Sequence, residues 1–67
     1  GGPQAIQPYV ETFIDFAKKH QELTFLVTEI GCGIAGFTPQ EIAPLFKNAI
    51  NISNIYLPKR FWEVLNK

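Results

Sequence analysis

The sequence predicts an α/β fold in the order helix, strand, helix, strand, helix. Two short segments, residues 24–29 and 54–57, are rich in β-branched and aromatic residues, which is typical of strands. The segments around them repeat apolar residues every three or four positions, as helices do. Because a long, helix-containing connection separates the two strands, we expect them to be parallel and joined by a right-handed crossover.

The first helix is expected to start near Pro8 and to end near His20, after a flexible segment over residues 1–4. A proline is tolerated in the first helical turn, where its missing N–H would have no partner in any case. Lys18 and Lys19 favour the negative C-terminal end of the helix dipole. The face predicted to be buried consists of Ile6, Tyr9, Val10, Phe13, Phe16 and Ala17.

The first strand and the segment after it differ sharply in composition. The continuous apolar run over residues 25–27 favours a strand that is covered on both faces, as in parallel sheets. The next residues contain Gly31, Gly33 and Gly36. Glycines so closely spaced predict a loop with unusual torsions or a close approach of another group to the backbone.

The second helix has a clear start signal. Thr38 and Glu41 form the pattern of a capping box, and Pro39 occupies the first helical position. Pro44 lies inside the helix and cannot donate a backbone hydrogen bond, so we expect a kink or a split there. The residues predicted to be buried are Ile42, Leu45, Phe46, Ala49 and Ile50.

The last helix is expected over residues 58–66, where Phe61, Trp62 and Leu65 form an apolar patch. The favoured interpretation is that this patch docks on the sheet. The alternative is an exposed face that binds a partner. Lys59 and Arg60 lie at the start of the helix, where cations are unfavourable for its dipole, so facing a phosphate or an acidic partner is a further alternative for them.

The composition narrows the class of protein. The chain has 67 residues, six basic and six acidic side chains, and a formal net charge of zero, which argues against a nucleic-acid binder or a polybasic membrane anchor. A single cysteine and a single histidine exclude an internal disulfide and make a zinc site implausible. We therefore expect no metal and no cofactor. A lone thiol and the lack of an export signal favour the cytoplasm.

The size of the chain suggests that it does not act alone. We treat residues 1–67 as one domain or as the C-terminal part of a larger one, because the sequence contains no Met. Two parallel strands are too few to form a stable sheet in water. We therefore expect either a homo-oligomer or a missing N-terminal segment that supplies further strands.

The glycine-rich loop is the candidate binding site. It follows a strand and precedes a capped helix, and parallel sheets bind ligands at the carboxyl ends of their strands. Backbone N–H groups of such a loop can converge on an anion such as phosphate. The alternative is a tight turn without a ligand. The predicted ligand-binding residues are Gly31, Cys32, Gly33, Ile34, Ala35, Gly36 and Phe37.

The same residues carry a resemblance. The segments 25–28, 30–37 and 41–46 resemble the C-terminal half of an uncharacterised bacterial and phage protein family. More remotely, residues 33–37 are similar to the second phosphate loop of macro domains, although Ala35 stands where those domains usually have an aromatic residue. The resemblance implies a three-layer, macro-like domain and an ADP-ribose-like or phosphate ligand. The loop that carries the asparagine used in hydrolysis by macro domains has no counterpart here.

No residue is a firm candidate for catalysis, so enzymatic activity stays undecided. Cys32 lies near a helix N-terminus that could lower its pKa, but His20 is the one histidine that could serve as its base. We expect Cys32 to be a small buried loop residue and His20 to cap its helix or to face solvent. Glu29 has no acid or base partner nearby in the sequence, which favours a surface carboxylate that pairs with a lysine.

Overall fold

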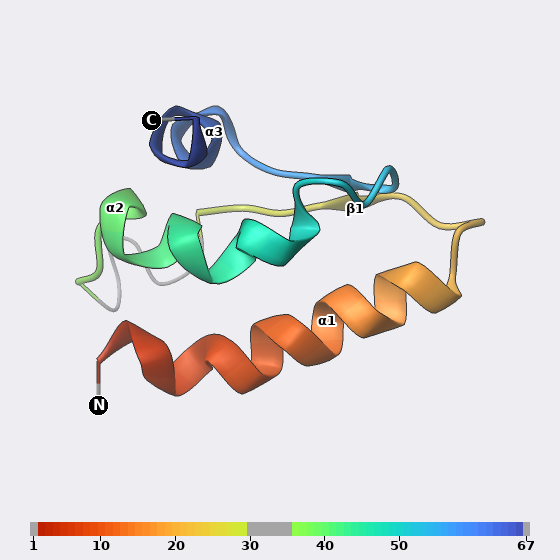
Figure 1. Cartoon of the computed structure of the whole chain (residues 1–67), viewed down its shortest axis with the longest axis horizontal. Helices are drawn as coiled ribbons and strands as arrows, with labels where there is room; N and C mark the ends of the chain where they lie inside the picture. The colour runs from red at the N-terminus through yellow and green to blue at the C-terminus, as the bar shows by residue number, and fades with distance from the viewer. Residues whose placement is uncertain (1, 30–35, 67) are drawn as a thin grey trace.

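The chain forms helices and a small parallel sheet in the predicted order. The computed structural model describes residues 2–29 and 36–66, and all structural statements concern those residues. Figure 1 shows the elements along the chain. They are η1 (Pro3–Ile6), α1 (Gln7–Lys19), β1 (Phe25–Leu26), α2 (Pro39–Ile42), η2 (Ala43–Ala49), β2 (Ile55–Tyr56) and α3 (Lys59–Leu65), where η marks a 3-10 helix. The mixed helix and strand class is confirmed.

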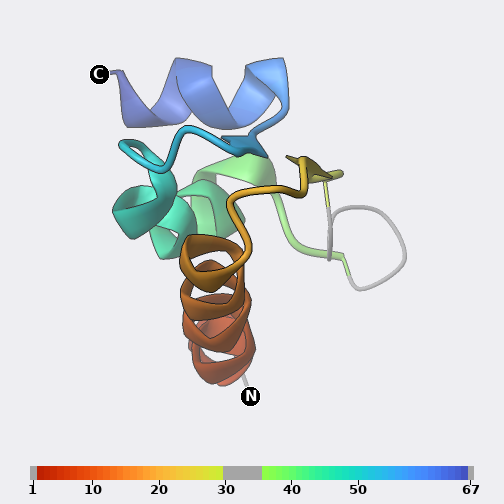
Figure 2. The same ribbon diagram turned by 90° about the vertical axis from the view of Figure 1, so that its right-hand side faces the viewer.

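The two strands pair in parallel, as predicted, with Phe25 opposite Ile55 and Leu26 opposite Tyr56. In both views the strands and η2 lie between α1 and α3 (Figures 1 and 2). Each strand is only two residues long, shorter than predicted. The expectation that the first strand is covered on both faces is wrong for this chain, because Leu26 is 77% exposed.

The bounds of α1 agree with the prediction to within one residue, and His20 is its C-terminal capping residue. Residues 1–4 were expected to be flexible, yet Pro3 and Gln4 already belong to the 3-10 turn η1. The predicted buried face needs a correction. Val10, Ile14 and Ala17 are buried, whereas Tyr9 is 75% exposed and Phe16 is also exposed.

The apolar positions of α1 cover too wide an arc for one contact surface. The helix therefore turns the stripe with Val10, Ile14 and Ala17 to the core. The core itself consists of buried apolar residues from α1, α2, η2, β2, α3 and the segment after β2, and Phe25 of β1 packs against it partly buried. The buried residues are Val10, Ile14, Ala17, Ile42, Ala43, Leu45, Phe46, Ala49, Ile55, Leu57 and Phe61.

The predicted split at Pro44 is confirmed, since α2 ends at Ile42 and the chain continues as the 3-10 helix η2. Pro44 has no N–H with which to continue the α-helical hydrogen bonds. A 3-10 helix has three residues per turn, so residues three apart lie in one row. One row is buried and consists of Ala43, Phe46 and Ala49. Another row is exposed and consists of Pro44 and Lys47, continued by Ile50 just after η2. The expectation that Ile50 is buried is therefore wrong.

The start of α2 follows the capping-box prediction. The backbone N–H of Thr38 donates to Oε1 of Glu41 at 2.9 Å, and Thr38 Oγ1 lies 3.2 Å from the same oxygen. Pro39 is the first residue of the helix. The box therefore fixes where the chain turns from the loop into α2.

The patch on α3 is packed, as the favoured interpretation expected, although its main partner is η2 rather than the sheet. Phe61 is fully buried, and its ring centroid lies 5.6 Å from that of Phe46 in η2. Trp62 and Leu65 are partly buried against the same core. This packing leaves no large exposed face on the Phe61 side of the helix.

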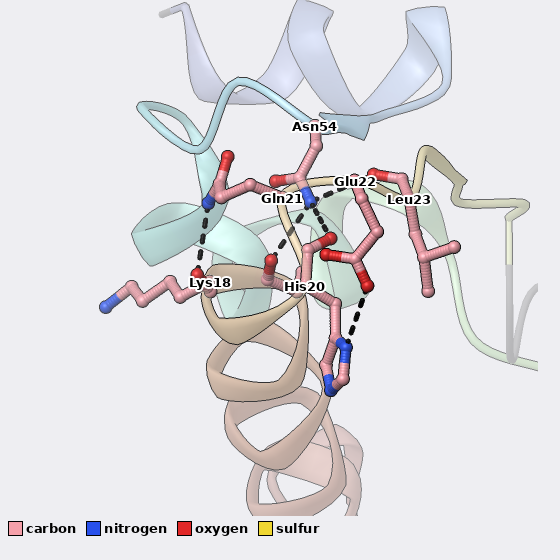
Figure 3. A network of polar contacts seen from close by, with 7 residues as sticks. Lys18, His20, Gln21, Glu22, Leu23 and Asn54 are labelled. Atoms are coloured by element: carbon pink, nitrogen blue, oxygen red, sulfur yellow. Dashed lines mark hydrogen bonds and ion pairs between the residues drawn. The ribbon is translucent and has the colours of Figure 1, made fainter.

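Asn54, just before β2, is the buried polar residue of the core. Its side-chain amide Nδ2 donates to the carbonyl oxygens of Ala17, His20 and Leu23 at 3.0, 3.1 and 3.1 Å. Figure 3 shows these contacts converging on the C-terminal end of α1. The last carbonyls of a helix lack partners within the regular helix, and the Asn54 amide supplies a donor there. The carbonyls of Ala17 and His20 also accept from the backbone N–H groups of His20 and Leu23.

None of the helices in the described part of the chain combines the length and the apolar character needed to cross a membrane.

Candidate functional site

Most of the predicted ligand loop lies outside the described residues. This applies to Gly31, Cys32, Gly33, Ile34 and Ala35. Of the predicted site, the structure places Gly36 and Phe37.

Gly36 has a backbone φ of +78°, in the left-handed region that favours glycine. A Cβ added there would meet no atom within 4 Å. The glycine is therefore required by its torsion and not by the close approach of another described group. This torsion is what a turn into α2 needs, whether or not the loop also holds a ligand.

Phe37 lies at an apolar groove between α1 and the outer edge of β1. The groove has a volume of about 470 Å³. Its walls come from α1, from β1 and the residues after it, and from Phe37 and η2. The lining residues are Ile6, Tyr9, Val10, Phe13, Phe25, Leu26, Val27, Thr28, Phe37 and Phe46.

The groove lies where the second apolar stripe of α1 is only partly covered by residues 2–29 and 36–66. Phe13 and Phe16 contact Phe25 edge to face, with ring centroids 5.4 and 5.9 Å apart. These contacts hold α1 beneath β1 near the middle and end of the helix. Toward the helix start, Ile6 and Tyr9 have no such partner in the described strands, and the space between them and β1 stays open.

The groove has almost no polar character. Among its lining residues, Thr28 and the hydroxyl of Tyr9 supply the side-chain polar groups, and none is charged. Such a surface suits apolar or aromatic groups and offers no cation for a phosphate. An anionic part of a ligand would have to be held elsewhere.

Glu29, at the end of the β1 segment, pairs with an arginine and not with the expected lysine. Its Oε1 lies 3.7 Å from Arg60 Nη1 at the start of α3. Both side chains are partly exposed, so the pair is a weak surface contact. It gives Arg60 an acidic neighbour within the chain. That Lys59 and Arg60 face a phosphate or an acidic binding partner stays a prediction.

A second, more polar hollow lies between α2 and α3, with a volume of about 490 Å³. Arg60 and Glu63 contribute opposite charges to its wall, next to Gln40. The carboxylate of Glu63 counters the charge of Arg60, so the hollow does not select an anion.

His20 lies at the C-terminal end of α1, as predicted, and contacts Glu22 at 3.2 Å through Nδ1 (Figure 3). Its ring packs against Phe16 at a centroid distance of 4.2 Å. The pKa of Glu22 is lowered, first by a hydrogen bond from its own backbone N–H and then by His20. These contacts give His20 a local structural role. Cys32, for which His20 was considered as a base, lies outside the described residues.

Within residues 2–29 and 36–66, no three His, Cys, Asp or Glu side chains come together as a metal site.

The groove was not predicted from the sequence. Its signal was present in α1, where two apolar stripes share one helix. One stripe carries Val10, Ile14 and Ala17, and the other carries Tyr9 and Phe13 and is continued by Ile6 of η1. A helix with two apolar stripes can pack against two surfaces. In the described part of the chain, one stripe is buried and the other is only partly covered.

The chain matches no protein-family profile, no curated protein and no solved structure.

Proposed function

We propose that the chain is a non-catalytic module that associates with a second copy of itself by covering the groove between α1 and β1. The observation that carries this proposal is the exposure of two large apolar side chains at the groove. Tyr9 is 75% exposed on the α1 side and Leu26 is 77% exposed on the β1 side.

The energetic reason is the hydrophobic effect. Removing apolar surface from water contributes about 25 cal/mol per Å², and aromatic side chains bury roughly 150–250 Å² each. Tyr9, Phe13 and Leu26 all line the groove and offer apolar surface of this kind. A domain as small as this one has little other core from which to gain stability.

The charge distribution does not oppose association. Six basic and six acidic residues give a net charge of zero, so two copies have no long-range repulsion to overcome. The groove itself carries no charged side chain that would lose its hydration on contact.

Sedimentation equilibrium over a wide range of concentrations tests this proposal. We expect a dimer whose dissociation constant rises at least about tenfold in Tyr9→Gln, equivalent to about 1.4 kcal/mol. Glutamine favours helices as well as tyrosine does or better, so this substitution leaves α1 intact. The matched control is Tyr56→Gln, which changes an exposed tyrosine that does not line the groove.

A cooperatively folded monomer at all concentrations would refute the proposal. So would equal weakening by Tyr9→Gln and Tyr56→Gln, because the groove would then have no special part in the contact.

A nucleotide derivative is the second candidate occupant, and one observation favours it. Phe37, which ends the predicted ligand loop, lines the groove near the carboxyl end of β1. A base or sugar in the groove could contact Phe37 and Tyr9, with its phosphates at residues 31–36. The groove volume lies in the range of small-molecule sites. A macro-like, three-layer arrangement belongs to this candidate and needs more strands than β1 and β2.

An NMR titration of the full chain with ADP-ribose, ADP and inorganic phosphate tests the second candidate. We expect amide shifts at residues 31–37 with all three compounds, and shifts of the aromatic groove residues with the nucleotides alone. Phe37→Leu should weaken the nucleotide response and spare the phosphate response. The two candidates compete for one groove, so a nucleotide that binds there should dissociate the dimer. No shift at millimolar concentration would leave the loop as a turn.

A further inference from the structure

We infer that the second copy is held by its own β1, which pairs antiparallel with β1 along the free edge of the sheet. The result is one four-stranded sheet in the order β2, β1, β1 of the partner, β2 of the partner. This inference rests on the proposed self-association and specifies its geometry.

Within residues 2–29 and 36–66, the backbone of β1 is hydrogen-bonded to a neighbouring strand on one side only. Phe25 N donates to Asn54 O and Val27 N donates to Tyr56 O, both at 2.8 Å. Backbone groups alternate in direction along a strand, so the N–H and C=O of Leu26 point away from β2. They form the outer edge of the two-stranded sheet, and Leu26 is also among the residues that line the groove.

The side chains at this edge, over residues 25–28, are not of the kinds that usually keep strand edges apart. Natural edges carry a lysine, a proline, a bulge or an inward-pointing charge. Residues 25–28 of β1 and its continuation read Phe, Leu, Val and Thr, without charge or proline. An apolar edge strand of this kind favours pairing with another strand.

A two-fold axis decides the orientation and the register. Two identical edges related by a two-fold axis can pair only antiparallel. Because both backbone groups of Leu26 face outward, Leu26 opposite Leu26 makes a pair joined by two hydrogen bonds. The same register brings together the two exposed leucine side chains on one face of the sheet and places Phe25 opposite Val27 on the face toward α1.

The register of the sheet supplies a matched pair of probes. Leu26 and Tyr56 lie opposite each other in β1 and β2, and both are exposed. In the proposed sheet, the two Leu26 Cα atoms are about 5.5 Å apart, within the range that a disulfide spans. The two Tyr56 positions are three strand spacings apart, about 14 Å, which no disulfide bridges.

The experiment introduces Leu26→Cys or Tyr56→Cys into a Cys32→Ser background and oxidises each protein under mild conditions, with circular dichroism to verify folding. At concentrations where the dimer forms, we expect Leu26→Cys to form an intermolecular disulfide. Its rate of formation should be at least about tenfold higher than in Tyr56→Cys. Adding Tyr9→Gln should remove this difference in rate.

Each other outcome has a distinct meaning. A dimer by sedimentation in which the two cysteines cross-link equally or not at all refutes the β1 edge but leaves self-association standing. A monomer without cross-links refutes both. A monomer whose groove resonances shift with a nucleotide assigns the groove to a small molecule and also overturns the inference.

Discussion

The side-chain amide of Asn54 lies 3.0 Å from the carbonyl oxygen of Ala17, thirty-seven residues earlier in the chain. The same amide also donates to the carbonyl oxygens of His20 and Leu23. One side chain just before β2 therefore links the end of α1 to the turn that leads to β1. The contact fixes the relative position of α1 and the sheet, and thereby the width of the groove between them.

Asn54→Ala should therefore be strongly destabilising. It removes a buried side chain whose amide bonds three carbonyl groups at the end of α1, and we expect the free energy of unfolding to fall by about 2–3 kcal/mol in urea titrations. Asn54→Asp should cost more, because it places a carboxylate against three carbonyl oxygens.

Asn48→Ala is the matched control, since Asn48 is exposed and its side chain reaches Glu11 at 3.2 Å on the surface. We expect a change within about 0.5 kcal/mol. Equal effects of Asn48→Ala and Asn54→Ala would contradict the structural role of Asn54.

Gly36→Ala should lower the free energy of unfolding by about 1 kcal/mol, because φ at this position is +78° and the left-handed region is unfavourable for alanine. No steric clash adds to this cost, since the new Cβ meets no atom within 4 Å. Gly36→Asn should cost less, as asparagine tolerates such torsions better. Thermal and urea unfolding of both variants would check the order, and an alanine variant as stable as the parent would contradict it.

Glu22 should make stability depend on pH. Its folded-state pKa is lowered, first by its own backbone N–H and then by His20. Its contribution is therefore present above the unfolded-state pKa of about 4.3 and is lost as the pH falls through the lower folded-state pKa. NMR titration of the Glu22 carboxyl should give a midpoint below about 4.3.

His20→Gln should raise the pKa of Glu22 only part of the way back, since the backbone hydrogen bond, the larger cause, remains. A midpoint at or above the ordinary value in the parent protein would be evidence against these contacts in solution.

Cys32→Ala should cost about 1 kcal/mol, the effect of a small change in packing, if Cys32 is a structural loop residue. Alkylation of the parent protein at neutral pH should be slow. Rapid alkylation with a pH profile well below the free thiol value of about 8.5 would instead identify a reactive thiolate.

The sequence predicted those features that depend on neighbours in the chain. The bounds of α1, the capping box of Thr38 and Glu41 and the split at Pro44 all follow from local hydrogen bonding, which the residues themselves determine. The parallel pairing followed from the length of the connection. Much of the predicted ligand loop is not described by the structure, and its role stays a prediction.

Features that depend on distant partners were not predictable in the same way. The apolar residues of α1 span so wide an arc that periodicity could not decide whether Tyr9 or Ile14 faces the core. The three hydrogen-bond partners of Asn54 are backbone carbonyls. Every residue has such a carbonyl, so the amino-acid types at these positions do not indicate the contact. The groove depends on which face of α1 is buried and on how Asn54 positions α1 against the sheet, and both are contacts between segments far apart in the sequence.

The 3-10 geometry of η2 also sets the reach of the connection between the strands. A 3-10 helix rises about 2.0 Å per residue and an α-helix about 1.5 Å, so the seven residues of η2 span about 14 Å instead of about 10 Å. The difference is roughly the length of one extended residue. If the same residues wound as an α-helix, this segment would be shorter by about that length, and residues 50–54 would have to make up the difference before β2. The 3-10 geometry around Pro44 therefore lengthens the connection between the two parallel strands.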